Sequence, residues 1–252
     1  MAKTAGMGDN LYVGGVDLSG DIASLERIGG GPNPLPATGI NASGFERLGG
    51  IRDAAFDITS WFNPALTQAH PTFAALPTTD VIASYFRGTA IGNPAASIVA
   101  KQVNYDGDRG ADGSLSFSVQ ELASGYGLEW GDQATVGMRT DTGATVGSAL
   151  DSGAATTNFG LQAYLQVDTF TGTDITIKLQ ESSDNGADTY ADVVGGGFTQ
   201  ITTGQAPKAQ RIATATNLAV ERYLKVTTVT TGGFVTCTFA VMIVRNQVVP
   251  TF

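Results

Sequence analysis

The residues best suited to acid–base chemistry are two aspartates, Asp141 and Asp151, which begin the triplets DTG and DSG. In aspartic proteases two such aspartates meet from separate lobes and share one proton. Here the triplets lie ten residues apart in one stretch rich in Gly, Ala and Thr, and Arg139 precedes the first of them. This spacing predicts no catalytic dyad.

A second group of acidic residues lies in the segment NYDGDRGADG, at Asp106, Asp108 and Asp112. Alternating carboxylates are typical of calcium loops. An EF-hand, however, needs an oxygen ligand where Gly110 stands and a glutamate where Phe117 stands. Two interpretations stay open: a weak cation site and, favoured here, a loop that is solvated or docked on a partner.

The remaining reactive side chains are one histidine and one cysteine. His70 precedes Pro71 and has no cysteine partner, metal-ligand spacing or nucleophile motif near it. Cys237 lies in the alternating segment 234–244, where a buried core thiol is expected. We therefore predict no catalytic residue, no metal site and no cofactor, and expect that the protein is not an enzyme.

The elements that carry these residues are expected to be mainly strands, because the chain is rich in Gly, Ala and Thr and poor in Lys, Glu and Leu. Around the acidic loop, short apolar or alternating runs predict strands at 80–87, 97–105 and 114–121. The loop 104–114 between the last two is longer than a hairpin requires. Long loops on a rigid sheet commonly carry function.

One helix is expected at 64–76, kinked or divided at Pro71. Upstream of it, the proline-rich stretch 32–36 is expected to be irregular. A Ser-Gly-Phe-Glu capping box predicts a single helical turn at 44–48, and strand character resumes at 51–62.

The second half of the chain reads as a series of short strands with turn signals between them. They are expected at 159–167, 174–181, 191–194, 198–202, 209–213, 221–229 and 234–245. Such a series predicts a β-sandwich with jelly-roll character. The small, polar stretch 141–158 before it is expected to be a linker.

Charge and hydropathy exclude several partners. The 252-residue chain has a formal net charge of −9, so generic attraction to nucleic acid or to an anionic membrane is not expected. Its first residues lack an apolar targeting segment, and no run reaches the length of a membrane span. A soluble product of the cytoplasm is therefore expected.

Two long segments resemble a known family. They are GFERLGGIRDAAFDITSWFNP at 44–64 and the segment 69–131, which contains YFRGTAIGNPAASIVAKQVNYDGDRGADGSLSFSVQELASGYGLEWG. Both are similar to major tail proteins of long-tailed bacteriophages that infect actinobacteria. The stretches KLQESSDNGADTYADV at 178–193 and RYLKVTTVTTGGFVTCTFAVMIVRNQ at 222–247 resemble the add-on domain that often ends such proteins.

The resemblance implies a virion structural protein of the tail, assembled in the host cytoplasm. Proteins of this family form hexameric rings that stack into a tail tube through which DNA passes. The implied partners are further copies of the chain, the tape measure, terminator and distal tail proteins, and DNA in transit. The implied fold is an N-terminal β-sandwich or partial barrel with one flanking helix, followed by the outer β-sandwich.

On this basis residues 1–140 are expected to form the tube domain and residues 159–252 the outer domain. The N-terminal arm 1–10 and the loop 104–114 are expected to reach neighbouring subunits or rings. The candidate contact residues are Asn104, Tyr105, Asp106, Asp108, Arg109, Asp112, Leu11 and Tyr12. Residues 1–145 hold fifteen acids and eight bases, which agrees with a tube wall that repels DNA.

Two other classes of protein remain as alternatives. A decoration or tail-completion protein of the virion is also rich in strands and lacks catalytic residues. A carbohydrate-binding β-sandwich would stack sugars on tryptophans, but Trp61 and Trp130 lie beside apolar strand residues, where packing in the core or at an interface is expected.

Overall fold

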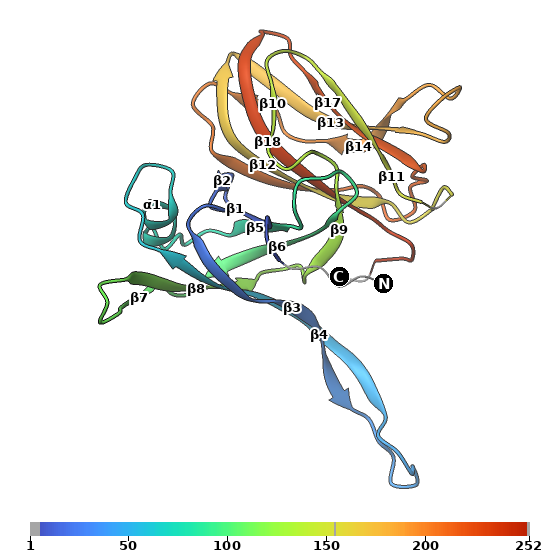
Figure 1. Cartoon of the computed structure of the whole chain (residues 1–252). Helices are drawn as coiled ribbons and strands as arrows, with labels where there is room; N and C mark the ends of the chain where they lie inside the picture. The colour runs from blue at the N-terminus through green and yellow to red at the C-terminus, as the bar shows by residue number, and fades with distance from the viewer. Residues whose placement is uncertain (1–5, 154, 251–252) are drawn as a thin grey trace.

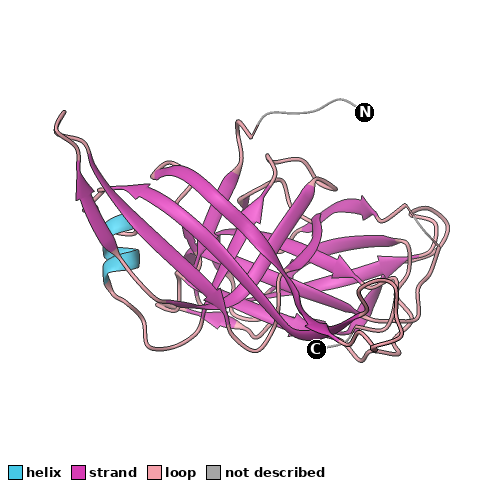
Figure 2. Cartoon of the chain, turned by 90° about the horizontal axis from the view of Figure 1, so that it is seen from below, coloured by secondary structure: helices cyan, strands magenta, loops and turns pink. Residues whose placement is uncertain are grey.

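The computed structural model describes residues 6–153 and 155–250, and its fold is mainly β, with two antiparallel sheets (Figures 1 and 2). The described elements are β1 (Asn10–Val13), β2 (Val16–Asp17), β3 (Ile22–Pro36), β4 (Arg47–Trp61), α1 (Ala69–Ala74), β5 (Val81–Phe86), β6 (Pro94–Gln102), β7 (Asp106–Arg109), β8 (Leu115–Ala123), β9 (Glu129–Gln133), β10 (Arg139–Asp141), β11 (Val146–Asp151), β12 (Leu161–Gly172), β13 (Asp174–Ser182), β14 (Ala191–Gly197), β15 (Ile201–Thr202), β16 (Lys208–Ala213), β17 (Tyr223–Val229) and β18 (Phe234–Arg245). The prediction of a mainly β fold is confirmed.

The larger sheet divides at β6. Its main path runs β16-β12-β18-β9-β6-β5-β1-β2. Strand β6 pairs with β9 through residues 94–97 and with β8 through residues 100–102. The strands β8, β4 and β3 therefore leave the path as a branch, which ends in the projecting β3–β4 hairpin (Figure 1).

The second half of the chain forms a β-sandwich, as the alternating sequence predicts. The smaller sheet, β11-β17-β13-β14 with β15, faces the strands β12 and β18 of the larger one. Alternate residues of β12 and β13 meet in one apolar core, among them Leu165, Val167, Ile175 and Leu179. Burying these side chains supplies the main stabilisation of this half.

Residues 141–158, expected to be a linker, contain the strand β11, which pairs with β17 in the smaller sheet. The Gly- and Thr-rich composition that suggested a linker also fits an outer strand, because the ladder needs only backbone groups. The division of the chain into domains at 140 and 159 stays a prediction.

Strand β12 is buried on both faces. Its polar residues Gln162 and Gln166 would face water if the sandwich stood alone, yet both are buried. With Tyr164 they face the strands of the first half, where Tyr164 packs with Tyr12 and Phe86. The two halves are therefore joined by a shared core as well as by the continuous sheet.

Gln166 makes the most specific contact between the halves. Its Oε1 accepts a hydrogen bond from the backbone N–H of Gly15 at 2.7 Å, and its Nε2 donates to the Ile82 carbonyl and the Ser84 hydroxyl. Gly15 adopts φ +99°, and a Cβ there would lie 2.4 Å from the Lys208 nitrogen. Only glycine allows this close approach of the β1–β2 turn to β16.

Replacing Gln166 by Leu is expected to lower the free energy of unfolding by about 2 kcal/mol, because the buried N–H of Gly15 loses its acceptor. Denaturant unfolding measures the loss. Gln210→Leu is the matched control, since Gln210 bonds exposed backbone groups of Thr199. Equal losses in the two variants would contradict a special role for Gln166.

The helix is shorter than the sequence predicts. It spans Ala69–Ala74 rather than 64–76, so the expected start at Pro64 is wrong. Asn63 instead accepts a hydrogen bond from the Ala65 nitrogen in a turn, and Thr67 has φ 57°. Pro71 lies in the first turn of α1, where a missing N–H costs nothing, so it opens the helix instead of kinking it.

The largest difference from the sequence predictions lies upstream. The stretch 32–36, expected to be irregular, and the helical turn expected at 44–48 both belong to a long hairpin. Strands β3 and β4 have fifteen residues each, and their pairing runs from Ile22 opposite Ser60 to Pro36 opposite Arg47. The alternating prolines fit because β3 is an edge strand of the sheet.

Candidate assembly surface

The most conspicuous functional element is the outer part of the β3–β4 hairpin, residues 29–54, which we call the arm. Residues 55–60 of β4 lie between β3 and β8, whereas residues 47–54, toward the end of the hairpin, pair with β3 alone. The arm is therefore a two-stranded ribbon that leaves the body (Figure 1). A two-stranded hairpin alone is marginally stable in water, so such an extension indicates a contact surface.

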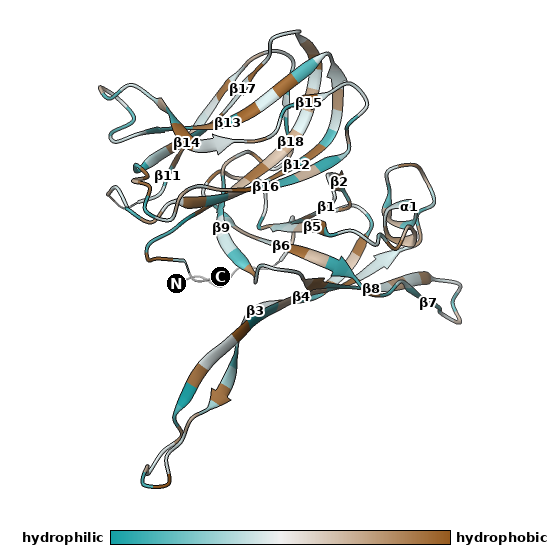
Figure 3. Ribbon diagram, turned by 180° about the vertical axis from the view of Figure 1, so that it is seen from behind, coloured by the Kyte–Doolittle hydropathy of each residue, from teal (hydrophilic) through white to brown (hydrophobic). Residues whose placement is uncertain are grey.

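The arm carries large apolar side chains that the rest of the described chain does not cover. In Figure 3 hydrophobic positions, in brown, and hydrophilic positions, in teal, both occur along this ribbon. The exposed residues are Leu35, Ile40, Phe45, Leu48 and Ile51. Phe45 and Ile40, at the end of the arm, are 83% and 110% exposed. A concentration of exposed large hydrophobic residues on one element marks an interaction site.

The β3 edge of the arm is closed to further strands. Pro32, Pro34 and Pro36 lie on its β3 edge, and proline has no N–H to donate to a new ladder. Prolines on an edge strand block pairing with another sheet. The turn is closed internally, because the Ala37 nitrogen donates to the Glu46 carbonyl at 2.9 Å. Contacts along the β3 edge must therefore be made by side chains.

A groove of about 1080 Å³ lies at the root of the arm. One wall is the arm itself, at Leu35 and Ile51, and the others are the loop 125–128, β9 and the chain after β18. Trp130 from β9 is 50% exposed in this groove, and its ring meets Tyr85 edge-on at 6.4 Å. Val249, in the chain after β18, also lines the groove and is exposed.

Neither tryptophan belongs to the core. Trp61 is 49% exposed at the end of β4, and Trp130 lies in the groove. Of the two roles expected for them, packing in the core is therefore wrong. Trp130 occupies a position from which a partner chain can bury it.

The acidic segment 104–114 forms a hairpin rather than an irregular loop. Its residues 106–109 are β7, which pairs with β8, and the Gly110 nitrogen closes the turn on the Ser114 carbonyl at 2.9 Å. Asp106, Asp108 and Arg109 are exposed on this hairpin. Their proposed role in contacts between rings stays a prediction.

The other residues of this segment have structural partners. The side-chain oxygen of Asn104 accepts a hydrogen bond from the backbone N–H of Gln120 at 2.7 Å. Tyr105 stacks on Phe117 at 4.2 Å. Hydrogen bonds from the Ser114 hydroxyl and nitrogen lower the pKa of Asp112. None of these arrangements resembles a calcium loop, and no group of three metal-ligating residues occurs in the part of the chain that the structure describes.

Two further contact candidates lie inside the subunit. Leu11 belongs to the core of the first half, and Tyr12 packs on Phe86 with ring centroids 5.1 Å apart. The N-terminal arm 1–10 falls partly outside the described residues, and within it Asp9 pairs with Arg87. A role for these residues between subunits stays a prediction.

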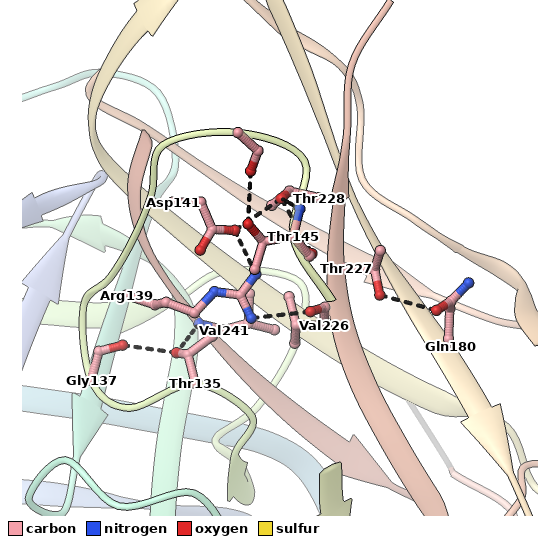
Figure 4. A network of polar contacts seen from close by, with 11 residues as sticks. Thr135, Gly137, Arg139, Asp141, Thr145, Gln180, Val226, Thr227, Thr228 and Val241 are labelled. Carbon is pink, nitrogen blue, oxygen red and sulfur yellow. Dashed lines mark hydrogen bonds and ion pairs between the residues drawn. The ribbon is translucent and has the colours of Figure 1, made fainter. Parts of the chain in front are cut away.

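The two aspartates of DTG and DSG do not meet in a dyad, since β10 and β11 belong to different sheets. Asp141 is buried and accepts hydrogen bonds from Arg139 at 2.7 Å and Thr228 at 2.9 Å (Figure 4). Arg139 also donates to the Val226 carbonyl at 3.0 Å, so this network joins the two sheets (Figure 4). Asp151 is exposed and paired with Arg222.

The single histidine and cysteine are structural. The Nδ1 of His70 lies 3.0 Å from the Tyr105 hydroxyl, and its ring packs on Phe62. Burial, and then the Asp141 carboxylate, raise the pKa of Cys237 to about 12. Its thiol is fully buried, which confirms the core position predicted from the sequence.

No helix among the described residues is long and apolar enough to span a membrane.

The sequence and the structure of the chain can be compared with those of known proteins. No protein-family model and no curated protein matches the chain. Among solved structures, a chain of a native gene transfer agent virion is 15% identical with a TM-score of 0.41, covering 51% of this chain and 98% of that one. The Dit (gp 19.1) protein of phage SPP1 is 12% identical with a TM-score of 0.34, covering 93% of this chain and 98% of that one.

A chain of the phage p2 baseplate is 8% identical with a TM-score of 0.36, covering 96% of this chain and 99% of that one. These structural neighbours are thus components of phage tails and related particles. TM-scores below 0.5 are too low to establish a common fold, so the function of this chain must be derived from its own residues.

Proposed function

We propose that this chain is a structural protein of a bacteriophage tail, and that its copies assemble into stacked rings that form the tail tube. The observation that carries the proposal is the arm, a ribbon that projects from the body and exposes five large apolar side chains. A subunit that remained alone would gain nothing from this exposure, whereas a neighbouring subunit would bury it.

The sequence adds independent support. The segments at 44–64 and 69–131, which resemble major tail proteins, include β4, the returning strand of the arm, the β7–β8 hairpin and part of the groove lining. The acidic excess in the first half suits a tube wall that DNA passes without binding. The two sheets of the body provide a rigid support from which the arm and the β7–β8 hairpin extend.

The proposal is tested by removing the apolar end of the arm. The variant with Ile40→Ser, Phe45→Ser and Leu48→Ser is expected to need a concentration higher by about tenfold or more for self-assembly, because each lost apolar contact weakens association. Sedimentation velocity over a concentration series measures the shift, and electron microscopy shows whether rings or tubes form.

The matched control is Val194→Ser with Val235→Ser. These valines are 72% and 67% exposed on β14 and β18, away from the arm. They should leave both assembly and unfolding unchanged. Wild-type protein that stays monomeric at every concentration would contradict the proposed function, as would an arm variant that assembles like the wild type.

A further inference from the structure

We propose that the groove at the root of the arm receives the apolar end of the arm of a second copy of this chain. This inference rests on the proposed function, since it requires self-assembly, and it names the surface that the arm occupies. The end of the arm is here residues 40–48, which include the exposed Ile40, Phe45 and Leu48.

The groove has the composition of an apolar acceptor site. Aromatic and aliphatic side chains line it together with the amides of Gln162, Asn246 and Gln247, and among the described lining residues only Arg52 and Glu129 are charged. Glu129 is already neutralised by a bidentate contact with Arg211, whose two nitrogens lie 2.9 Å from its carboxylate oxygens. An exposed tryptophan in such a groove is the kind of residue that contributes most binding energy at interfaces.

Charge also fits a second copy. The chain carries a net charge of −9, so its copies repel one another over most of their surface. Residues 29–51 of the arm contain one acid, Glu46, and one base, Arg47, and the groove lining likewise has one of each sign. Contact between these two neutral surfaces avoids the general repulsion.

The arm of the same copy cannot fill the groove. Leu35, Gly50 and Ile51 of the arm form one wall of the groove, and the ribbon continues away from the body to the turn between β3 and β4 (Figure 1). Ile40 and Phe45 belong to this turn. The occupant must therefore come from another molecule. Each copy has one arm end and one groove on different surfaces, so a series of copies, each with its arm in the groove of the next, makes heterologous contacts. Such a contact closes into a ring or continues as a filament.

Insertion of side chains is favoured over addition of a strand. The prolines at 32, 34 and 36 deprive the β3 edge of the arm of N–H groups, so a new ladder is confined to the other edge, along β4. The apolar side chains at its end stay fully available, because the tertiary structure provides no cover for them. These side chains can be buried in a groove with apolar walls, whereas pairing at a sheet edge would use only the backbone of the arm.

Cysteine cross-linking tests this assignment. Phe45→Cys is placed in one preparation and Val249→Cys in a second that carries a size tag, and the two are mixed under mild oxidation. Cys237 is fully buried, so the native thiol does not compete. We expect a disulfide between the two different chains. The matched control mixes Phe45→Cys with Val194→Cys. Val194 is at least as exposed as Val249 but lies on β14 of the smaller sheet.

The outcomes separate this inference from the proposed function. Multimers that cross-link through Val249→Cys but not through Val194→Cys support the groove as the receptor. Multimers without this selectivity overturn the groove assignment and leave self-assembly intact. A protein that is monomeric and does not cross-link overturns both.

A second variant probes the groove without cysteines. Trp130→Ala should raise the concentration needed for half-maximal assembly by about tenfold or more, the effect typical of a central tryptophan. Unfolding of the monomer verifies that the variant is folded. Assembly at the wild-type concentration by a folded Trp130→Ala protein would also overturn the assignment.

Discussion

Replacing Arg211 by Met should lower the free energy of unfolding by about 3–5 kcal/mol, the cost of leaving one member of a buried ion pair without its partner. Arg211 and Glu129 are nearly inaccessible to solvent, with 9% and 6% of their side chains exposed. They bind through two hydrogen bonds of 2.9 Å each. Once Arg211 is lost, the Glu129 carboxylate stays buried without a counter-charge.

The pair belongs to a larger cluster that joins three strands. Tyr164 of β12 donates to Glu129 of β9, and Arg211 of β16 donates to the Tyr164 oxygen at 3.0 Å. Burial, and then the charge of Glu129, raise the pKa of Tyr164, so its phenol remains a donor at neutral pH. The guanidinium of Arg211 also lies 3.8 Å from the centre of the Tyr126 ring.

Denaturant unfolding tests this prediction against a natural control. Arg222 and Asp151 form a pair with the same bidentate geometry, at 2.7 and 2.8 Å, but both side chains are exposed. Arg222→Met should therefore cost much less than Arg211→Met, because water screens an exposed pair. Arg211→Met combined with Glu129→Met should recover most of the loss, since no uncompensated charge remains. Equal losses for Arg211→Met and Arg222→Met would refute the argument.

The second large effect concerns Glu121, which should make the protein less stable as the pH rises. Glu121 lies in β8 between Phe56 of β4 and Gln102 of β6, and it is fully buried. Neither of its carboxylate oxygens has a hydrogen-bond partner in the described part of the chain. The amide nitrogen of Gln102 is directed to the carbonyls of Phe73 and Asn104 instead.

Desolvation by burial raises the pKa of Glu121 from 4.5 to about 8. The folded protein therefore holds a proton that the unfolded chain releases above pH 4.5. The stabilising contribution is complete below pH 4.5 and is lost as the pH rises through about 8. Linkage over this interval amounts to about 5 kcal/mol.

Glu121→Gln should remove this pH dependence, because the amide has nearly the same shape and carries no charge. The variant is expected to be more stable than the wild type at pH 9, and to resemble it near pH 5. The free energy of unfolding at several pH values between 5 and 9 measures the difference. Glu46→Gln, on the exposed end of the arm, controls for the change in net charge. Parallel pH profiles for the wild type and Glu121→Gln would contradict the buried, unpartnered carboxyl.

Alternation along the sequence predicted the strands of the sandwich, because period-two burial is a local signal. Strand β18 spans Phe234–Arg245, the range expected from the sequence, and β13 and β17 lie within two residues of expectation. The pattern could not show that β12 is covered on both sides. Gln162 and Gln166 read as solvent-facing, and only the packing of the first half against this face decides otherwise.

The candidate surface was only partly within reach of sequence reasoning. The sequence predicts a long polar loop at 104–114, and its residues 106–109 are exposed, while its role in contacts stays a prediction. The arm was missed, because Gly29–Gly31 and the prolines after them are local signals for the end of a strand. Strand β3 extends through these residues because β4 lies alongside and the ladder holds the backbone extended. From the sequence alone Leu35, Ile40, Phe45 and Leu48 cannot be distinguished from apolar residues of the core, and only the structure shows that they are exposed.

The sequence by itself determined the mainly β composition of this protein, its acidic charge, the absence of a catalytic motif and most strands of its second half. These properties depend on residue type and on neighbours a few positions away. The direction of the arm, the groove at its root and the burial of Glu121 and Glu129 were decided by the tertiary structure alone. Each depends on pairings between segments far apart in the chain, such as β8 with β4 and β16 with β12. No local pattern specifies such pairings, because many strands of similar hydropathy compete for each edge.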